Sequence, residues 1–410
     1  MRDIEYEVSV SLSRFDEIIL ECLTRESYGL LYGLGGCSIY FSNRFFLNKE
    51  IKYQNYSIEI LDRIIAWTNL NMIPNDISLG VPISASCWLV DQFIKQDFLD
   101  QEEKINSSLI VDLISKSVPI QEVKNNNHDL FYGFIGRAII LIENDKEANQ
   151  PHIDNIIETL KINMIKGKNG IYWNTPDPFY PSPVLEKTIN LGIPHGSCGI
   201  ILFLLKCCDV YNLHKELKPL LEGSISWLID RLEKENNKLL YSYSSTPSGT
   251  GKLGWCYGDQ AIALTLLRYY ETFNCEKAKA KAYELIEQAA SKPMEQTGVQ
   301  FYPKYGYYDM RVCHGTSSVA YMWQKMYHIT KDENIKALAD KWINITLDNL
   351  EIFLPQLDKI AELEKDNEMI DTSMGFLNGL SGVGLALISF LNPKLSDWDK
   401  LLLLDRPGRE

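Results

Sequence analysis

The sequence lacks several features that mark common classes of protein. It has no run of about 18 apolar residues, so we expect no membrane-spanning segment. Its N-terminus, Met1 to Glu7, carries charges of both signs and no apolar stretch, so no signal peptide is predicted. Positive charge is scarce, because the net charge of the 410 residues is -13 and the pI is about 5.1. General nucleic-acid binding requires a basic surface and is therefore not expected. These absences predict a cytoplasmic protein.

The chain also has few histidines, and its cysteines are not regularly spaced. The chain has six histidines and nine cysteines, and no two cysteines are in a Cys-x-x-Cys arrangement, so a zinc ribbon is not indicated. An odd number of irregularly spaced cysteines in a long chain is typical of reduced thiols. With 45% hydrophobic and 23% charged residues, the chain can bury a large core.

What the sequence does contain is a glycine turn that recurs along its length. A nearly uninterrupted apolar run follows each turn, and amphipathic stretches such as residues 56–70 and 152–164 lie between the turns. Successive turns are 47 to 64 residues apart, which is room for two helices and their loops. The turn glycines are Gly33, Gly80, Gly133, Gly196, Gly258, Gly315 and Gly379.

This repeat predicts an all-α protein with a layer of buried helices inside a layer of amphipathic helices. If the array closes on itself, it is an α/α toroid, and if it stays open, it is a solenoid of the armadillo or tetratricopeptide kind. Glycines allow the ends of the inner helices to converge, which favours closure. No linker is visible, so we expect a single domain over residues 1–410.

Some segments depart from the helical pattern. Residues 166–191 contain four closely spaced prolines, which exclude helix and predict a small extended or β-hairpin insertion. A polar insertion with a possible strand is expected within residues 237–252, and a loop at residues 300–308. We expect His128 to be solvated in a polar loop, and residues 405–410 to form a frayed tail.

Two short clusters carry residues suited to chemistry. Cys256 in one turn, with Cys313 and His314 in the next, offers two thiols and one imidazole. Three such ligands are what a zinc ion needs when its fourth position remains open, although buried thiols and a core histidine are the alternative. His195 occupies the same place as His314, immediately before a turn glycine. Because all turns should face the same end of the array, we expect these side chains to gather there.

Three motifs resemble the signatures of the lanthionine synthetase C-like family. The resemblance covers residues 28 to 391 and implies an α/α toroid of seven inner and seven outer helices. The Gly-x-x-Gly turns at 33–36, 133–136 and 379–382 also match the repeats of the family. The three motifs are Asn-Leu-Gly-Ile-Pro-His-Gly at 190–196, Trp-Cys-Tyr-Gly at 255–258 and Cys-His-Gly at 313–315.

The resemblance also implies a site. By similarity, one zinc ion is held by Cys256, Cys313 and His314, with its fourth position open. His195 matches the catalytic histidine of the family, and Asp129 lies where the family has a functional aspartate. The residues themselves leave open which of these two is the acid or base, and Asp129 could instead cap a helix.

Further positions match residues that line the site in the family. Trp255 and Tyr257 correspond to its aromatic residues, and Lys252 stands where the family usually has arginine. We assign all three to substrate binding. Lysine keeps the positive charge but not the planar fork of arginine, so this contact is altered.

The function implied is that of a cyclase. Such an enzyme adds a cysteine of a dehydrated precursor peptide to a dehydroalanine or dehydrobutyrine in the same peptide and forms a thioether ring. The expected partners are that peptide, a separate dehydratase and an exporter complex, which would bring the protein to the inner face of the membrane. Two alternatives remain: addition of glutathione or another small thiol to dehydrated residues, and a non-catalytic helical binding scaffold.

Overall fold

The computed structural model describes residues 3–23, 28–71, 78–104, 111–112, 114–115, 127–175, 189–234, 251–357 and 374–408. Within this part of the chain, seven helices start at or just after the glycine turns: α2 (Leu34–Asn48), α4 (Pro82–Lys95), α7 (Phe134–Asp145), α9 (Ser197–Tyr211), α11 (Asp259–Phe273), α13 (Thr316–Thr330) and α16 (Leu380–Leu391). Six longer or more polar helices alternate with them: α1 (Ile4–Cys22), α3 (Ile51–Asn71), α8 (Gln150–Asn163), α10 (His214–Lys234), α12 (Glu276–Ala290) and α14 (Glu333–Leu357).

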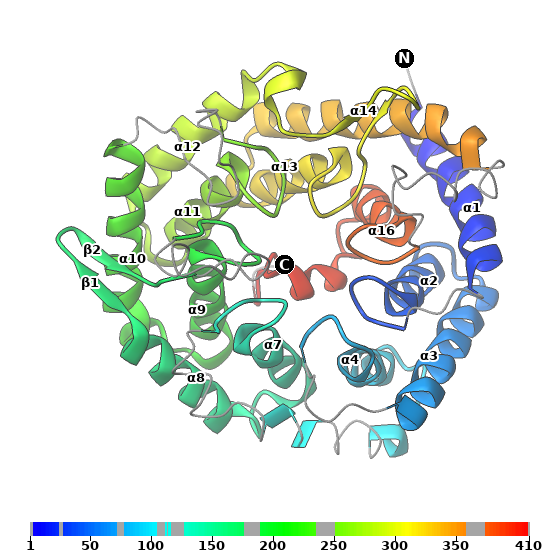
Figure 1. Cartoon of the computed structure of the whole chain (residues 1–410), viewed down its shortest axis with the longest axis horizontal. Coiled ribbons are helices and arrows are strands. Elements are labelled where there is room, and N and C mark those ends of the chain that lie inside the picture. The colour runs from blue at the N-terminus through cyan, green and yellow to red at the C-terminus, as the bar shows by residue number, and fades with distance from the viewer. Residues whose placement is uncertain are drawn as a thin grey trace.

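These helices form two concentric rings (Figure 1). The inner ring closes because α16 packs against α2, and the outer ring closes because α1 packs against α14. The fold is therefore an α/α toroid, as predicted, and the open solenoid is excluded. Six of the seven expected outer helices lie in the described ranges; the remaining one would fall between α4 and α7, where residues 116–126 are outside the described part of the chain.

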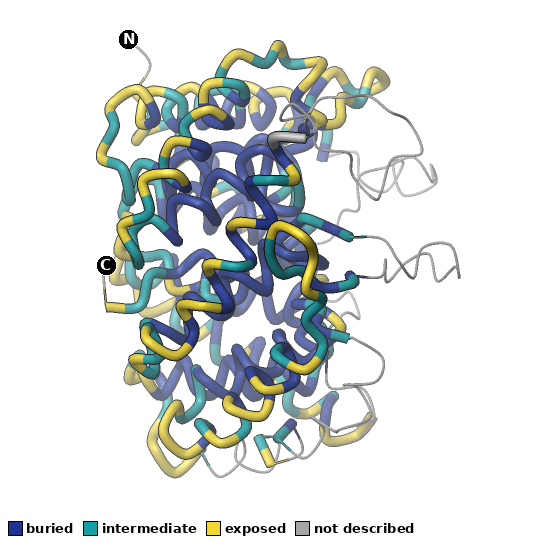
Figure 2. The backbone as a smooth tube through the Cα atoms, turned by 90° about the vertical axis from the view of Figure 1, so that its left-hand side faces the viewer, coloured by how far each residue is buried: buried dark blue, intermediate teal, exposed yellow. Residues whose placement is uncertain are grey.

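The burial of each ring follows from its sequence pattern. In α9, all residues from Ser197 to Cys208 are buried, because outer helices cover one side and neighbouring inner helices cover the others. In α12, only one face is buried, which matches its amphipathic sequence. Figure 2 shows this arrangement as a buried inner layer with the exposed residues on the outside.

Main-chain hydrogen bonds join successive glycine turns at one end of the toroid. In each, an N–H of one turn donates to a carbonyl of the next, and the series runs around the ring. All inner helices therefore begin at this end. The bonds, from donor to acceptor, are Leu30 to Gly80, Leu79 to Phe131, Leu130 to Pro194, Ile193 to Cys256, Cys313 to Leu377 and Leu377 to Leu31, with N–O distances of 2.9 to 3.2 Å.

Close packing within the turn explains its glycine. The chain folds back so that the carbonyl of Asn190 accepts from the N–H of Ser197 at 2.9 Å, which satisfies the first donor of α9. A Cβ at Gly196 would lie 2.3 Å from that carbonyl oxygen, so no other residue fits there without rearrangement. Equivalent bonds close three other turns: Phe134 to Asn127, Asp259 to Lys252 and Thr316 to Asp309.

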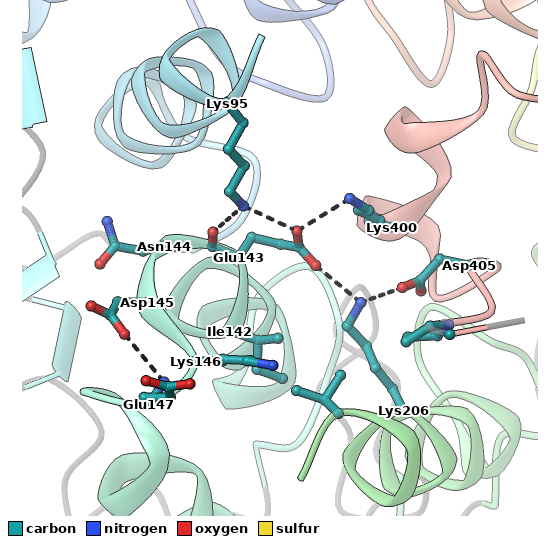
Figure 3. Close-up of a pocket in the computed structure, with 13 residues that line it drawn as sticks. Lys95, Ile142, Glu143, Asn144, Asp145, Lys146, Glu147, Lys206, Lys400 and Asp405 are labelled. Atoms are coloured by element: carbon teal, nitrogen blue, oxygen red, sulfur yellow. Dashed lines mark hydrogen bonds and ion pairs between the residues drawn. The ribbon is translucent and has the colours of Figure 1, made fainter. Parts of the chain in front are cut away.

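The C-terminal segment lies in the middle of the ring (Figure 1), and its ion pairs with late residues of the inner helices place it toward the end opposite the glycine turns. It includes η4 (Asp397–Leu402), which contacts α7. Lys206, the tenth residue of α9, pairs with Asp405 at 2.5 Å and with Glu143, the tenth residue of α7, at 3.1 Å (Figure 3). Lys325, the tenth residue of α13, pairs with Asp399 at 2.7 Å.

The frayed tail expected from residue 405 onward is therefore wrong for its first residues. Asp405 is only 3% exposed, and Arg406 is paired with Glu271. The physical reason is that buried lysine and arginine side chains of the inner helices require carboxylate partners, and the C-terminal segment supplies some of them.

Short hairpins interrupt the helical pattern. β1 (Ile165–Gly167) pairs antiparallel with β2 (Gly170–Tyr172), which confirms a hairpin in the predicted insertion. Its four prolines, and the possible strand at 239–243, lie outside the described residues. The segment predicted as a loop at 300–308 contains a second hairpin, β3 (Phe301–Tyr302) with β4 (Tyr307–Tyr308). Its turn is closed by Gly306, whose φ of 78° is readily adopted by glycine.

Among the described residues, no helix is both long enough and apolar enough to cross a membrane.

Candidate metal centre and its surroundings

The residue immediately before the turn glycine is a tyrosine or a histidine in most turns. This position is occupied by Tyr32, Tyr132, His195, Tyr257 and His314 in five of the seven turns. Because main-chain hydrogen bonds hold the turns side by side, these side chains belong to the same end of the toroid. The repeat thus places residues that are distant in sequence around one mouth.

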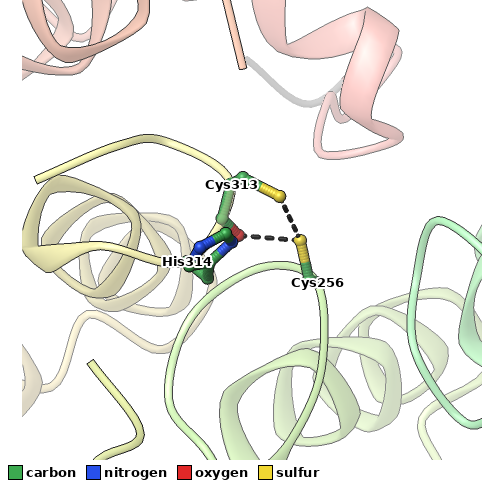
Figure 4. A group of neighbouring side chains, drawn as sticks. All are labelled: Cys256, Cys313 and His314. Carbon is green, nitrogen blue, oxygen red and sulfur yellow. Dashed lines mark hydrogen bonds between the residues drawn. The ribbon is translucent and has the colours of Figure 1, made fainter. Parts of the chain in front are cut away.

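Cys256, Cys313 and His314 lie together at this end (Figure 4). The two Sγ atoms are 2.7 Å apart, and one ligand atom from each residue lies within 4.8 Å of the other two. Thiolate and imidazole are ligands that zinc takes in proteins. The donor set and its span therefore suit one zinc ion bound by three protein ligands.

The joint between these two turns differs from the others. The N–H of Trp255 donates to Ser318 Oγ at 2.9 Å instead of to the next turn, and the carbonyl of Cys313 is contacted by Cys256 Sγ at 2.8 Å. Gly254 and Gly258 have φ of 116° and 103°, a region that strongly favours glycine. A thiol pair thus replaces the usual main-chain contact at this joint.

Asp309 fixes the orientation of His314. Its Oδ2 lies 3.2 Å from His314 Nε2, which leaves Nδ1 for a metal. Arg311 holds the same carboxylate, with Nη2 at 2.9 Å from Oδ2. Metal-bound histidines commonly pair their second nitrogen with a carboxylate in this way, so the contact supports the metal assignment. The sequence analysis missed Asp309 and Arg311; the available signal was an acidic residue shortly before a proposed histidine ligand.

The electrostatics of the metal-free group also favour a cation. The hydrogen bond from Cys256 lowers the pKa of the Cys313 thiol well below its usual range, whereas burial raises the pKa of Cys256. Burial alone would lower the pKa of His314, but the neighbouring Cys313 thiolate and Asp309 raise it to about 10. Zinc binds thiolates and neutral imidazole, so a metal ion that binds this group would displace protons from it.

His195 and Asp129 form a hydrogen-bonded pair on adjacent turns. His195 Nδ1 lies 2.5 Å from Asp129 Oδ2. The other oxygen, Oδ1, accepts from the N–H groups of Phe131 and Tyr132 at 2.7 and 2.9 Å. Gly133 is the N-cap of α7, so Asp129 stabilises the turn rather than capping that helix. The carboxylate is thus held on both sides and fixes the imidazole.

Aromatic rings surround the imidazole of His195. Phe131 contacts it edge to face at 5.4 Å, and Tyr132 stacks on it with centroids 6.2 Å apart and planes at 5°. Tyr257, next to Cys256, lies 6.4 Å from it. His195 therefore lies beside the turn that carries the metal-ligating thiol.

His128, expected to be solvated, is instead 4% exposed. It precedes Asp129, and its ring packs edge to face against Phe134. The polar asparagines before it gave no sign that the chain turns inward at this point.

The sequence also matches a known family. The match is to the family described as lanthionine synthetase C-like protein, and it covers residues 100–403. The chain belongs to this family. The fold is similar to the solved structure of nisin cyclase, with a TM-score of 0.65, 17% sequence identity and coverage of 98% of each chain. At that identity, the likeness establishes the fold.

Trp255 takes an unexpected place for a substrate-binding residue of a lanthionine synthetase C-like protein. Its side chain is 1% exposed, and its indole N–H donates to the carbonyl of Leu402 in the C-terminal segment at 3.0 Å. It also packs against Phe131, with centroids 5.6 Å apart. This burial favours a supporting role beneath the metal centre.

Lys252 stands where the family usually has arginine. Its side chain passes against Gly298, where a Cβ would lie 2.6 Å from Lys252 Cγ. Burial raises the pKa of Cys256, and the Lys252 charge lowers it in part, so the ammonium group acts on the thiol pair. Tyr257 is half-buried, and its ring lies over Gly192, where a Cβ would be 2.7 Å from the ring.

Proposed function

We propose that this protein is a zinc-dependent peptide cyclase. It adds the thiol of a cysteine to a dehydroalanine or dehydrobutyrine of the same precursor peptide and forms a lanthionine or methyllanthionine ring. One observation carries the proposal: the group Cys256, Cys313 and His314 lies on turns next to the hydrogen-bonded pair of His195 and Asp129. Soft metal ligands and an oriented imidazole thus share one end of the toroid.

Three residues would hold the zinc ion. Cys256 and Cys313 would bind as thiolates and His314 would bind through Nδ1, because Asp309 already holds its Nε2. When bound, zinc supplies the acidity that deprotonates a substrate thiol, whose usual pKa of about 8.5 leaves it mostly protonated at neutral pH. Because these residues supply three ligands, such an ion would have a fourth position open to the substrate thiol.

His195 moves the proton. A C–S bond forms at the β-carbon while the C=C π bond breaks, and its electron pair gives an enolate with charge on the adjacent carbonyl oxygen. The proton lost by the thiol is returned at the α-carbon, so atoms and charge balance. Asp129 occupies Nδ1, and we therefore assign the transfer to Nε2 of His195. On this proposal, Asp129 is a positioning residue and His195 is the acid and base, a choice that the sequence left open.

The substrate on this proposal is a peptide that has already been dehydrated. The dehydroamino acids come from a separate dehydratase, and the product leaves by an exporter. Lys252 and Tyr257 are assigned to substrate contact, and Trp255 to support of the turn that carries Cys256.

The test uses purified protein loaded with zinc and a peptide that contains one dehydroalanine and one cysteine. Ring formation leaves the peptide mass unchanged but removes its free thiol, so the product resists alkylation and the substrate does not. Cys313→Ala is the matched inactive control. Glutathione is offered in a parallel reaction, and a gain of its mass by the peptide would indicate the small-thiol alternative. A zinc-loaded protein that performs neither reaction would leave only a binding scaffold.

A further inference from the structure

Tyr32 and Tyr132 occupy the same place in the repeat as His195 and His314. Each lies immediately before the turn glycine. Tyr32 is 39% exposed and Tyr132 is 38% exposed. Both side chains are therefore accessible at the end of the toroid where the proposed chemistry takes place.

The two hydroxyl groups are hydrogen-bonded to each other. Tyr32 belongs to the first turn and Tyr132 to the third, so the pair spans the second turn, where Leu79 precedes the turn glycine. Leucine has no polar group, and the side chain of Leu79 is fully buried. The pair is thus a product of the ring arrangement and not of local sequence.

Tyr132 is anchored to the proposed proton-transfer group. Its N–H donates to Asp129 Oδ1 at 2.9 Å, and its ring lies parallel to the imidazole of His195, with centroids 6.2 Å apart. The same aspartate therefore fixes both the backbone of Tyr132 and the ring of His195. A substrate atom that reaches His195 lies beside the tyrosine pair.

The hydroxyl groups of Tyr32 and Tyr132 can act as hydrogen-bond donors. Burial, the hydroxyl of Tyr132 and the charges of Cys313 and Cys256 raise the pKa of Tyr32 above its usual range. Burial, Asp129 and Cys313 likewise raise the pKa of Tyr132. A tyrosine with its ordinary pKa of about 10 is already protonated at neutral pH, so both phenols can serve as hydrogen-bond donors.

We propose that the Tyr32–Tyr132 pair donates a hydrogen bond to the carbonyl oxygen of the dehydroamino acid in the substrate and stabilises the enolate. This assignment rests on the proposed cyclase function and adds two catalytic residues to it. As the C–S bond forms, negative charge grows on that oxygen, so a donor aimed at it strengthens in the transition state. In the pair, the hydroxyl that accepts from its neighbour keeps its own proton and becomes a better donor.

The metal ligands and His195 already have other roles in the proposed reaction. Cys256, Cys313 and His314 are used by the metal, and His195 is used for the proton at the α-carbon. Neither group supplies a neutral donor for the carbonyl oxygen. Tyrosine hydroxyls fill that role without a change of protonation state at neutral pH.

The experiment compares Tyr32→Phe, Tyr132→Phe and the double variant with wild type. Tyr6→Phe in α1, a tyrosine that is 66% exposed, is the matched control. We measure zinc content, kcat and KM for ring closure, and equilibrium binding of a peptide that contains dehydroalanine but no cysteine. We expect kcat to fall by about 10²-fold in each single variant, with KM and peptide binding changed by less than about threefold. The double variant should lose little more than one single variant, because the pair acts as a unit.

Other outcomes overturn the assignment in distinguishable ways. Unchanged kcat in both single variants removes the tyrosines from catalysis while the cyclase function stands. Loss of zinc, or a loss of peptide binding equal to the loss of kcat, makes their role structural or one of ground-state binding. A wild type that binds zinc but closes no ring overturns the proposed function, and the assignment falls with it.

Discussion

The indole Nε1 of Trp255 lies 3.0 Å from the carbonyl oxygen of Leu402, 147 residues further along the chain. This hydrogen bond joins the turn that carries Cys256 to the C-terminal segment in the middle of the ring. Trp255 also contacts Phe131, which contacts His195. The C-terminal segment therefore helps to hold in place the turns that carry Cys256 and His195.

Trp255→Phe should destabilise the fold. The variant removes the donor from a buried carbonyl and leaves space beneath the turn, and the first effect alone costs about 1–3 kcal/mol. The free energy of unfolding in urea measures it. Trp67→Phe, at a half-buried stacked tryptophan in α3, is the control and should cost less. Equal losses of unfolding free energy in the two variants would show that the hydrogen bond to Leu402 adds no stability beyond that of the other tryptophan.

Lys206→Met should destabilise the fold more strongly. Lys206 is buried between Glu143 and Asp405, so its removal leaves two buried carboxylates without their shared cation, a change that typically costs about 3–5 kcal/mol. Lys161→Met is the contrast, because Lys161 pairs with exposed Glu158 and Glu216 and should lose at most about 1 kcal/mol. Chemical denaturation of both variants gives the comparison. A small loss for Lys206→Met would mean that the C-terminal segment does not depend on this pairing.

Cys313→Ala and His314→Ala should lose bound zinc, as measured by metal analysis of protein purified under reducing conditions. Asp309→Asn should keep the three ligands but bind zinc about 10- to 100-fold more weakly, because the partner of His314 Nε2 loses its charge. Cys275→Ala, at a partly exposed cysteine before α12, is the control and should bind zinc normally. Full zinc content in Cys313→Ala would refute the proposed ligand set.

Asp129→Asn should lower kcat for ring closure by roughly 10- to 100-fold with zinc content unchanged, because His195 loses the anion that fixes its Nδ1. The pH profile of kcat should also shift, which a purely structural defect would not produce. Asp145→Asn is the matched control, since Asp145 Oδ1 likewise accepts from two backbone N–H groups, of Glu147 and Ala148. If both variants behave alike, Asp129 serves only the turn.

Burial of His128 should make stability depend on pH. Burial lowers its pKa from 6.5 to about 4, so between these values the unfolded chain binds a proton that the folded chain does not. Stability therefore rises with pH through this window and is lost as the pH falls from 6.5 to 4, by at most about 1.4 kcal/mol per pH unit. Unfolding free energies of wild type and His128→Gln across this range test it. Their difference at pH 7 reports packing alone, and parallel curves would contradict the prediction.

The repeat of glycine turns determined much of this protein by itself. The spacing and the apolar pattern predict the helical class and the burial of the helix after each turn. They also show that His195 and His314 occupy equivalent positions in the repeat. Applied to every turn, the same rule would also have pointed to Tyr32 and Tyr132. Likewise, the tenth residue of several inner helices is polar, as at Glu143, Lys206 and Lys325, a signal that buried partners must exist.

Tertiary structure alone decided the rest. Closure of the ring depends on contacts between α16 and α2 and between α1 and α14, which no local pattern encodes. The inward turn of His128, the bond from Trp255 to Leu402 and the burial of Asp405 each join segments that the sequence does not relate. Local sequence fixes which residues prefer helix, turn or burial, because those preferences act over a few residues. Which buried charge meets which partner is set by the whole ring, because only the closed toroid brings those groups into reach.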